Sequence, residues 1–343
     1  MQAKQIAPYK GDRIMALKLL ILGTGAVGKN LLNILSQTNK FSVCGIANST
    51  GYLYSKKGIE KNKLKKIANG KKISEFIDFV GKTAIDIVQN GDYDVLVELT
   101  TTNLKDGEPA FTHIKTALSR RKHVVTSNKG PLALKFHELN SLAKKNNALL
   151  KFEATVGGAI PIFTTVNNYF TENKIISFMG ILNGTTNYIL QRMSDEKMQY
   201  ETALKEAQQF GIAERNPFYD VEGVDAAAKL VILTNAIFGR NATLSEVKRI
   251  GISRITPDII ELAASQNYAI KLICCASING IMEVAPKLIP ISDQLASVNG
   301  TLNAISFETK LAGRLTFIGK GAGGKETASA VLVDLIEISN KVA

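Results

Sequence analysis

The 343-residue chain has 45% hydrophobic and 21% charged residues, which is typical of a folded globular protein with room for two domains and excludes a disordered chain. No apolar run reaches the roughly 18 residues that cross a bilayer, and residues 1–15 lack the apolar centre of a signal peptide, so we expect a cytoplasmic protein with a flexible extension at 1–15. The formal net charge of +12 comes largely from lysines between Lys56 and Lys72 with no aromatic residue among them, which favours a solvated helix face over nucleic-acid binding.

The first predicted elements are a strand at Leu17–Leu22, a glycine turn and a helix. The turn carries Gly23, Gly25 and Gly28 in the spacing GxGxxG, and apolar residues at helical spacing follow it. A structural glycine turn is the alternative, but strand, turn and helix in this order favour dinucleotide binding. We therefore predict an α/β fold with a Rossmann-type doubly wound parallel sheet, and a dinucleotide-binding domain over residues 16–150.

The second predicted strand, from Phe41, ends at Asn48, Ser49 and Thr50. An acid that binds the ribose is expected near this point in NAD-binding chains, and none is present. NADP is therefore possible, and NAD is not excluded. Lys56 and Lys57 follow closely and could neutralise a 2'-phosphate, although solvated surface lysines are an equal alternative.

Two further strands, Asp94–Leu99 and His123–Thr126, end in polar residues. Because ligands bind beyond the carboxyl ends of parallel strands, Thr100 and Lys129 are predicted to lie at the site, with a surface lysine as the alternative for Lys129. The histidines His113, His123 and His137 follow no catalytic or metal-binding pattern, so we expect them to be structural or solvated. Three cysteines, Cys44, Cys274 and Cys275, have no metal spacing and are predicted to be structural thiols.

After residue 150 the pattern changes to strands grouped with helices, which predicts a second, α+β domain at 151–315. Residues 149–163 read as a strand followed by a glycine loop, and residues 268–289 as two strands joined by a hairpin turn at Asn279 and Gly280. The hairpin is apolar on both faces, with Leu272 alternating against Ile273, so we predict a second cover in the form of a twofold homodimer. A last glycine turn opens a helix in 316–343, which we expect to return to the first domain.

The segment Val224–Phe238 reads as a buried helix closed by Gly239. Asp225 and Lys229 interrupt it four residues apart and therefore on one face. One interpretation is an ordinary surface ion pair with no functional role. The apolar surroundings instead favour a pair that lines a cleft and can take part in proton transfer.

The motifs together resemble those of homoserine dehydrogenases over nearly the whole chain from Leu17 onward. They are GTGAVG, TSNKGPLA, EATVGGAIP, ILNGTTNYIL, AERNPFYDVEGVDAAAK and GAGGKETASA. The first is shared with many dehydrogenases, and the ordered combination is specific to this family. The resemblance implies reversible NAD(P)H-dependent reduction of L-aspartate 4-semialdehyde to L-homoserine, in the biosynthesis of threonine, methionine and isoleucine, by an enzyme that commonly dimerises through its second domain.

The resemblance also implies roles for individual residues. It assigns catalysis to Lys229, Asp225 and Lys129, and substrate binding to Glu214, Asp220, Asn183, Gly184 and Thr185. It assigns the cofactor, NADP or NAD, to Gly23, Gly25, Ala26, Val27, Gly28, Asn48, Ser49, Thr100, Lys129, Gly321 and Glu326. Glu153, with the backbone of Val156, Gly158 and Ile160, matches a site for a monovalent cation, Na⁺ or K⁺.

These roles form a coherent reaction, in which Lys229 supplies a proton as hydride reaches the aldehyde carbon and Asp225 positions that lysine. Two rivals are weaker. Aspartate semialdehyde dehydrogenase needs a nucleophilic cysteine at the cofactor cleft, and all three cysteines fall within predicted strands. A non-catalytic NAD(P)-sensing protein would not need Asp225, Lys229 and Glu214 together.

Overall fold

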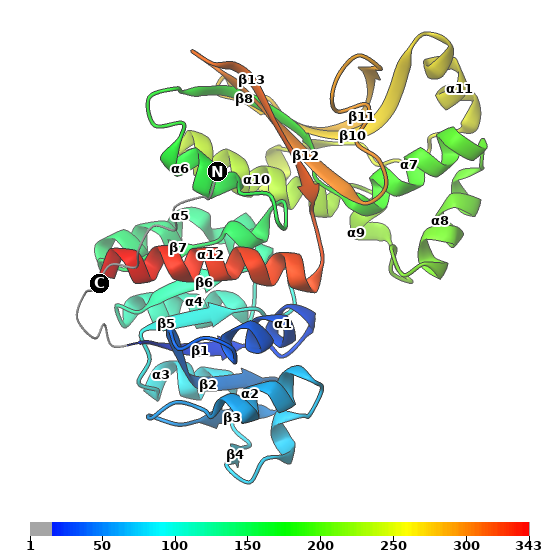
Figure 1. The fold of residues 1–343 in the computed structure, drawn as a ribbon. Coiled ribbons are helices and arrows are strands. Elements are labelled where there is room, and N and C mark those ends of the chain that lie inside the picture. Colours follow the sequence, from blue (N-terminus) through cyan, green and yellow to red (C-terminus); the bar gives the residue numbers. More distant parts are fainter. Residues whose placement is uncertain (1–15, 343) are drawn as a thin grey trace, which may run out of the picture.

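The computed structural model describes residues 16–342, so the predicted extension at 1–15 lies outside the described residues. The described chain forms two layered units, each built on one sheet, and the last helix crosses back over the first unit (Figure 1). This arrangement confirms the predicted α/β class with a Rossmann-like first domain and a second sheet domain.

The first sheet has the strand order β4-β3-β2-β1-β5-β6-β7. Strands β2, β1, β5, β6 and β7 are parallel, whereas β3 and β4 are antiparallel additions at one edge. The order reverses between β1 and β5, and ligands bind at such a switch point. The strands are β1 (Leu17–Leu22), β2 (Phe41–Asn48), β3 (Gly51–Tyr54), β4 (Phe79–Val80), β5 (Val95–Glu98), β6 (His123–Thr126) and β7 (Leu150–Lys151).

Helices cover both faces of this sheet because its strands are apolar on both sides. Leu19 and Ile21 pack in one core cluster with α1, α2 and α12, while Leu20 and Leu22 pack in another with α3, α4 and α5. The helices are α1 (Ala26–Leu35), α2 (Lys61–Ala68), α3 (Ala84–Asn90), α4 (Ala110–Ser119), α5 (Lys129–Lys145) and α12 (Gly324–Val342). The return of the last helix, drawn red in Figure 1, agrees with the prediction.

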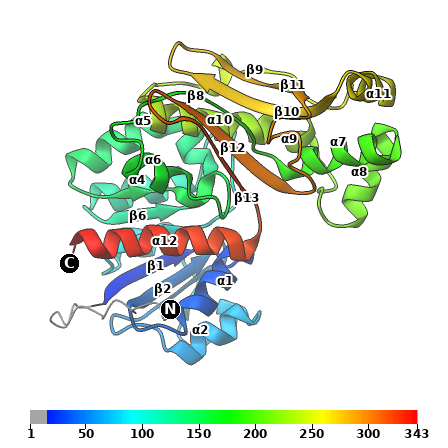
Figure 2. The same cartoon turned by 45° about the horizontal axis from the view of Figure 1, so that its top comes forward.

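The second sheet has the order β13-β12-β8-β10-β11-β9 and is antiparallel except for the β11–β9 pair. Its strands are β8 (Ile175–Ile181), β9 (Lys248–Arg249), β10 (Tyr268–Ser277), β11 (Met282–Pro290), β12 (Leu302–Thr309) and β13 (Gly313–Lys320). Its helices are α6 (Ile162–Asn168), α7 (Gly184–Glu196), α8 (Tyr200–Gln209), α9 (Phe218–Val221), α10 (Val224–Phe238) and α11 (Pro257–Ser265). Helix α10 has the predicted bounds and packs between β10 and α5 of the first domain, as Figure 2 lets the reader follow.

Two segment boundaries differ from the predictions. The strand expected to open the second domain is the short β7, which pairs with β6 and so completes the first sheet. The predicted boundary at residue 316 falls inside β13, whose pairing with β12 continues to Lys320, and α12 begins only at Gly324. The first difference reflects pairing between strands separated by α5, and the second reflects how far the hairpin of β12 and β13 stays paired. Neither is encoded by the apolar pattern of one segment.

The outer face of the β10–β11 hairpin is partly covered by the chain itself, which corrects the prediction that this face needs a second subunit as its cover. Ile273 is fully buried, because Leu295 and Val298 of the segment 291–301 fold over it. Ile278 and Ile281, by contrast, remain exposed beside the hairpin turn. No helix among residues 16–342 is long and apolar enough to cross a membrane.

Candidate active site

One carboxylate joins two lysines from different domains. Asp225 Oδ2 lies 2.8 Å from Lys229 Nζ on the same helix, and Asp225 Oδ1 lies 3.0 Å from Lys129 Nζ. Lys129 is the first residue of α5, which Asn128 caps by accepting a hydrogen bond from Gly130 N. The packing of α10 on α5 thus turns a local i,i+4 pair into an interdomain cluster.

The charges of this cluster are strongly coupled. Burial would raise the pKa of Asp225, but the ammonium groups of Lys129 and Lys229 outweigh it and hold that pKa below its ordinary value. The Asp225 carboxylate in turn raises the pKa of Lys129 against the opposing effect of burial. The cluster is therefore two ammonium groups held by one carboxylate, with a net positive charge facing the cleft.

Lys229 is the more enclosed of the two lysines, with a side chain 9% exposed against 24% for Lys129. Its ammonium group also donates to Leu182 O at 2.6 Å, at the end of β8. An ammonium group has three N–H donors, so after Asp225 and Leu182 one remains for a ligand oxygen.

Asn183 links Asp220, one of the two acids predicted to bind substrate, to this cluster. Its Nδ2 donates to Asp220 Oδ1 at 2.7 Å and to Asp225 Oδ2 at 3.2 Å, while its Oδ1 caps α7 by accepting from Thr186 N. Asn183 is therefore the cap of α7, and Gly184 and Thr185, which the resemblance also assigns to the substrate, lie in its first turn. Burial raises the pKa of Asp220, although the hydrogen bond from Asn183 opposes the shift.

A cleft of about 680 Å³ between the domains brings the predicted substrate and catalytic residues together. Lys129, Asp225 and Lys229 line it together with all five predicted substrate residues: Glu214, Asp220, Asn183, Gly184 and Thr185. Several predicted cofactor residues, namely Val27, Thr100 and Gly321, line the same cleft.

A second hollow of about 890 Å³ lies at the carboxyl ends of β1, β2 and β5. Gly23, Gly25, Asn48 and Ser49 line it, and it shares Leu99 and Thr100 with the first cleft. A Cβ atom on Gly28 would come within 2.1 Å of Gly23 O, whereas one on Gly25 would meet nothing within 4 Å. The third glycine thus permits close helix packing and the second leaves open space for a phosphate, so the residues fit a dinucleotide.

Lys56 and Lys57 do not line this hollow and are exposed, which favours solvated surface lysines over the alternative of a role at a 2'-phosphate. Strand β3 runs back along β2, so that Ser55 N donates to Cys44 O at 2.8 Å. Cys44 lies four residues before Asn48, roughly 13 Å away along a strand. The two lysines therefore lie toward the opposite end of the sheet from the cofactor.

Of the remaining predicted residues, Gly158 lines the interdomain cleft, and the others line neither hollow. Ala26 begins α1, and Glu326 lies in the first turn of α12, 3.4 Å from Lys320 Nζ. The Glu153 carboxylate accepts hydrogen bonds from Phe163 N, Thr164 N and Thr164 Oγ1 at 2.6–2.9 Å. Among the described residues no group of three or more His, Cys, Asp or Glu could hold a metal.

The histidines and cysteines make hydrogen bonds within the fold or are buried in its core. His113 is buried with Nδ1 2.8 Å from Glu98 Oε2, and His123 Nδ1 accepts from Leu149 N. Burial raises the pKa of both Cys44 and Cys274 to about 12, so neither is an activated thiol. Cys275 lies on the second sheet, outside both clefts.

Sequence reasoning missed some residues of the cleft. Ser127 and Thr155 belong to motifs quoted for the resemblance, and their neighbours could have indicated them. Thr301 and Asn303 lie at the start of β12 outside every motif, and only folding brings them to the cleft.

Comparison with known proteins agrees with this geometry. Residues 23–153 match the family model for the NAD binding domain of homoserine dehydrogenase, and residues 161–336 match the homoserine dehydrogenase model. A homoserine dehydrogenase of Methanocaldococcus jannaschii is 45% identical, over 94% of this chain and 98% of its own. A crystal structure of a candidate homoserine dehydrogenase from Archaeoglobus fulgidus has a TM-score of 0.86 at 41% identity, covering 94% of this chain and 99% of that one. A hyperthermophilic archaeal homoserine dehydrogenase in complex with NADPH has a TM-score of 0.82 at 29% identity, covering 95% and 98%.

Proposed function

The chain belongs to the homoserine dehydrogenase family of NAD(P)-dependent oxidoreductases, and on that premise we propose that the Lys129–Asp225–Lys229 cluster is where L-aspartate 4-semialdehyde and L-homoserine are interconverted. The observation that carries this proposal is Asp225, which holds a lysine from each domain inside the one cleft that also contains the substrate-side acids. A cofactor-sensing protein would have no use for this arrangement.

The substrate is proposed to lie with its ammonium group toward the acidic side of the cleft. Glu214 and Asp220 provide carboxylates there, and charge-assisted hydrogen bonds to an ammonium are among the stronger contacts that a site can make. Asn183 fixes Asp220 by its 2.7 Å hydrogen bond, so this carboxylate is held in place before substrate arrives. The substrate's reacting end then faces Lys229.

Lys229 is proposed to move the proton. When bound, the reduced nicotinamide supplies the hydride for the aldehyde carbon. The free N–H of Lys229 donates to the aldehyde oxygen, which becomes the hydroxyl of homoserine, and accepts the proton back in the reverse direction. Asp225 and Leu182 O keep this ammonium group in one position, while Lys129 adds positive charge beside the developing alkoxide.

The residues that line the cofactor hollow are compatible with NADP as well as with NAD. Its end at Asn48 and Ser49 carries no carboxylate, and the acid among its lining residues, Glu108, is engaged by Thr112. Lys56 and Lys57 lie far from this end of the hollow, so Lys82 is the better candidate for binding a 2'-phosphate. Val80, the last residue of β4, pairs with Tyr52 of β3. Lys82 follows two residues later and therefore lies beside the turn at 48–51. We propose that NADP binds at least as well as NAD.

A monovalent cation is proposed at the loop after β7. Gly157 and Gly158 both have positive φ, at 79° and 57°, and curve the backbone tightly. No donor from the described residues reaches the carbonyl oxygens of Val156 or Gly158, while Ile160 O accepts from Ile162 N. The Glu153 carboxylate, with three donors already, has acceptor capacity for an ion as well.

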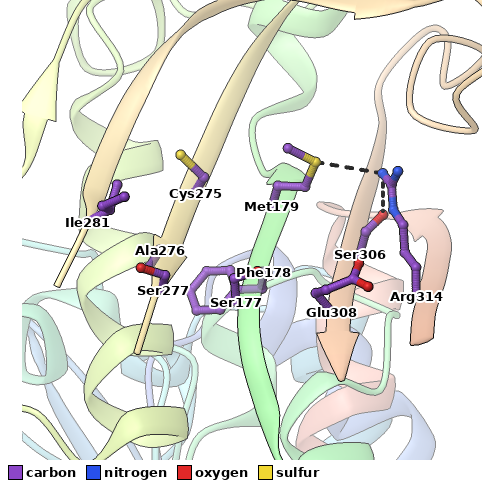
Figure 3. Close-up of a pocket in the computed structure, with 10 residues that line it drawn as sticks. All are labelled: Ser177, Phe178, Met179, Cys275, Ala276, Ser277, Ile281, Ser306, Glu308 and Arg314. Carbon is purple, nitrogen blue, oxygen red and sulfur yellow. Dashed lines mark hydrogen bonds between the residues drawn. The ribbon is translucent and has the colours of Figure 1, made fainter. Parts of the chain in front are cut away.

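A twofold homodimer through the second sheets is also proposed. A hollow of about 350 Å³ lies on β8, β10 and β12. Met179, Cys275, Ile281, Ser306 and Arg314 are among its lining residues (Figure 3). Ile281 is 62% exposed at the edge of this face, so apolar surface remains there beyond the part that residues 291–301 cover. Cytoplasmic placement and a role in threonine, methionine and isoleucine biosynthesis stay predictions from the sequence.

One initial-rate assay tests the central proposal. Purified chain is mixed with L-homoserine and either NADP⁺ or NAD⁺, and the reduced cofactor is followed by absorbance. Turnover that depends on homoserine supports the proposal, and its absence with both cofactors contradicts it. The alternative oxidation of the semialdehyde through a thioester is disfavoured, because Cys44 and Cys274 are buried with raised pKa values.

A further inference from the structure

Asn303, on β12, is a buried amide without a hydrogen-bond partner in the described chain. Asn303 is 1% exposed and lines the interdomain cleft. Its side-chain oxygen, Oδ1, is buried and accepts no hydrogen bond. A buried unsatisfied polar group costs about 1–3 kcal/mol, so such a group needs an explanation.

The other buried asparagines make the exception clear. Each uses both ends of its side-chain amide, the nitrogen as donor and the oxygen as acceptor. They are Asn128, Asn183, Asn187 and Asn235. The fold therefore satisfies these buried amides, including that of Asn183, which lines the same cleft, whereas the amide of Asn303 is left without a partner.

Asn303 sits where the cofactor side of the cleft meets the catalytic side. Its neighbour Ala304 pairs with Ile181, which puts Asn303 beside Leu182, the residue whose carbonyl oxygen holds Lys229. On its other side the Asn303 amide packs directly against Gly321. A Cβ atom on Gly321 would lie 1.9 Å from Asn303 Cγ. Gly321 belongs to the segment that leads into α12 and lines the same cleft.

The Asn303 side chain has one donor group and one acceptor group, and this indicates which chemical group of a ligand it can bind. A carboxylate only accepts hydrogen bonds and would leave Oδ1 unpaired, whereas an ammonium only donates and would leave Nδ2 unpaired. A primary carboxamide offers a donor and an acceptor side by side and satisfies both. Among the reactants of the proposed function, on which this inference rests, the nicotinamide ring carries such a group.

We propose that Asn303 binds the carboxamide of the nicotinamide ring and so sets which face of the ring lies toward Lys229. Nδ2 donates to the carboxamide oxygen, and Oδ1 accepts from the carboxamide nitrogen. Gly321 is required for this, because any side chain there would displace the Asn303 amide.

The test measures binding without turnover. Dissociation constants are determined by calorimetry for NADP⁺ and for its 3-acetylpyridine analogue, in which a methyl group replaces the amide nitrogen. The wild type should prefer NADP⁺ by about 5- to 10-fold, as for one neutral hydrogen bond. In Asn303→Ala the preference should fall to about twofold or less, and in the control Asn235→Ala, which loses a buried amide away from the cleft, it should persist.

A preference that survives in Asn303→Ala overturns the proposal, as does a change confined to the KM for homoserine. Should Asn303→Ala fail to fold, Asn303→Asp serves instead: it keeps an acceptor and loses the donor, so both cofactors should weaken together by about 5- to 10-fold. Unchanged affinities in that variant also overturn it. Homoserine oxidation by the wild type is assayed in parallel, so a failure of the proposed function is separable from a failure at Asn303.

Discussion

Lys129 and Asp225 join the two domains through one 3.0 Å ion pair. Lys129 begins α5 of the dinucleotide-binding domain, and Asp225 lies in the first turn of α10 in the second. Because Asp225 also holds Lys229, one carboxylate contacts both the first domain and the ammonium group that is proposed to transfer the proton. A change in the packing of α10 on α5 would therefore reach the reacting atoms directly.

The first prediction concerns Lys229→Ala. Turnover of homoserine should fall by about 10²- to 10⁴-fold, the usual contribution of a positioned general acid. Binding of NADP⁺, measured by fluorescence or calorimetry, should stay within about twofold, because the glycine turn is untouched. The exposed Lys115→Ala, which loses a surface pair with Glu138 and a cation–π contact with Phe111, is the control. If Lys229→Ala kept activity within threefold of wild type, Asp225 and Lys229 would be an ordinary ion pair with no catalytic role.

Glu214→Gln should raise the KM for homoserine by about tenfold and change kcat little, since one charge partner of the ammonium group is lost. Initial rates over a range of homoserine concentrations measure this. Glu201→Gln, on the exposed side of α8, is the matched control. An unchanged KM would remove Glu214 from the substrate pocket, although it lines the cleft.

Lys82→Ala should weaken NADP⁺ binding by about tenfold and leave NAD⁺ binding unchanged, because only NADP⁺ carries the 2'-phosphate. Lys56→Ala should change neither, since Lys56 lies toward the other end of the sheet. Calorimetry at one fixed ionic strength checks both. If Lys56→Ala weakens NADP⁺ and Lys82→Ala does not, the placement argued from the strand directions is wrong. NAD⁺ tenfold tighter than NADP⁺ in the wild type would refute the proposed cofactor preference.

The assembly prediction uses an exposed residue of the second sheet. Light scattering at micromolar concentration should report twice the 37.1 kDa chain mass. Ile281→Asp should shift the protein toward monomer, because Ile281 is exposed beside the proposed contact face. Ile273→Asp is unsuitable as a test, since Ile273 is buried under residues of its own chain. A wild-type monomer under these conditions contradicts the dimer.

Asp334 gives a prediction for stability against pH. Burial, and then the charge of Glu153, raise the pKa of Asp334 to about 8. Between its ordinary value near 4 and about 8, the folded chain holds a proton that the unfolded chain has lost, so the free energy of unfolding falls as pH rises through this window. Asp334→Asn removes this titration. It should gain stability over the wild type between pH 5 and pH 8, by roughly 1 kcal/mol or more.

Urea unfolding followed by circular dichroism, in buffers free of Na⁺ and K⁺, measures the difference at the two pH values. The surface variant Asp258→Asn, at the start of α11, is the control and should follow the wild type at both. Parallel behaviour of Asp334→Asn and the wild type from pH 5 to pH 8 would show that Asp334 is ionised in the folded chain.

Elements governed by local pattern were predictable from the sequence. The first strand, its glycine turn and the helix after it have the predicted places, because each residue's role there depends on its immediate neighbours. Helix α10 has the predicted bounds for the same reason: apolar residues continue to Phe238, and Gly239 closes the helix in the left-handed conformation. The Asp225–Lys229 pair follows from helical spacing alone.

The features decided by tertiary structure depend on strand direction and on contacts between distant segments. The composition near Lys56 and Lys57 shows two cations, but only the antiparallel return of β3 shows that they lie toward the opposite end of the sheet from the hollow at Gly23 and Asn48. Ile273 looked uncovered because the segment that covers it begins 18 residues later, at residue 291. Asn303 lies in no motif, and the pairing of β12 with β8 brings it beside Leu182 in the cleft that Lys229 also lines. Side-chain periodicity shows which face of a segment is apolar, whereas its partner is chosen by packing across the whole chain.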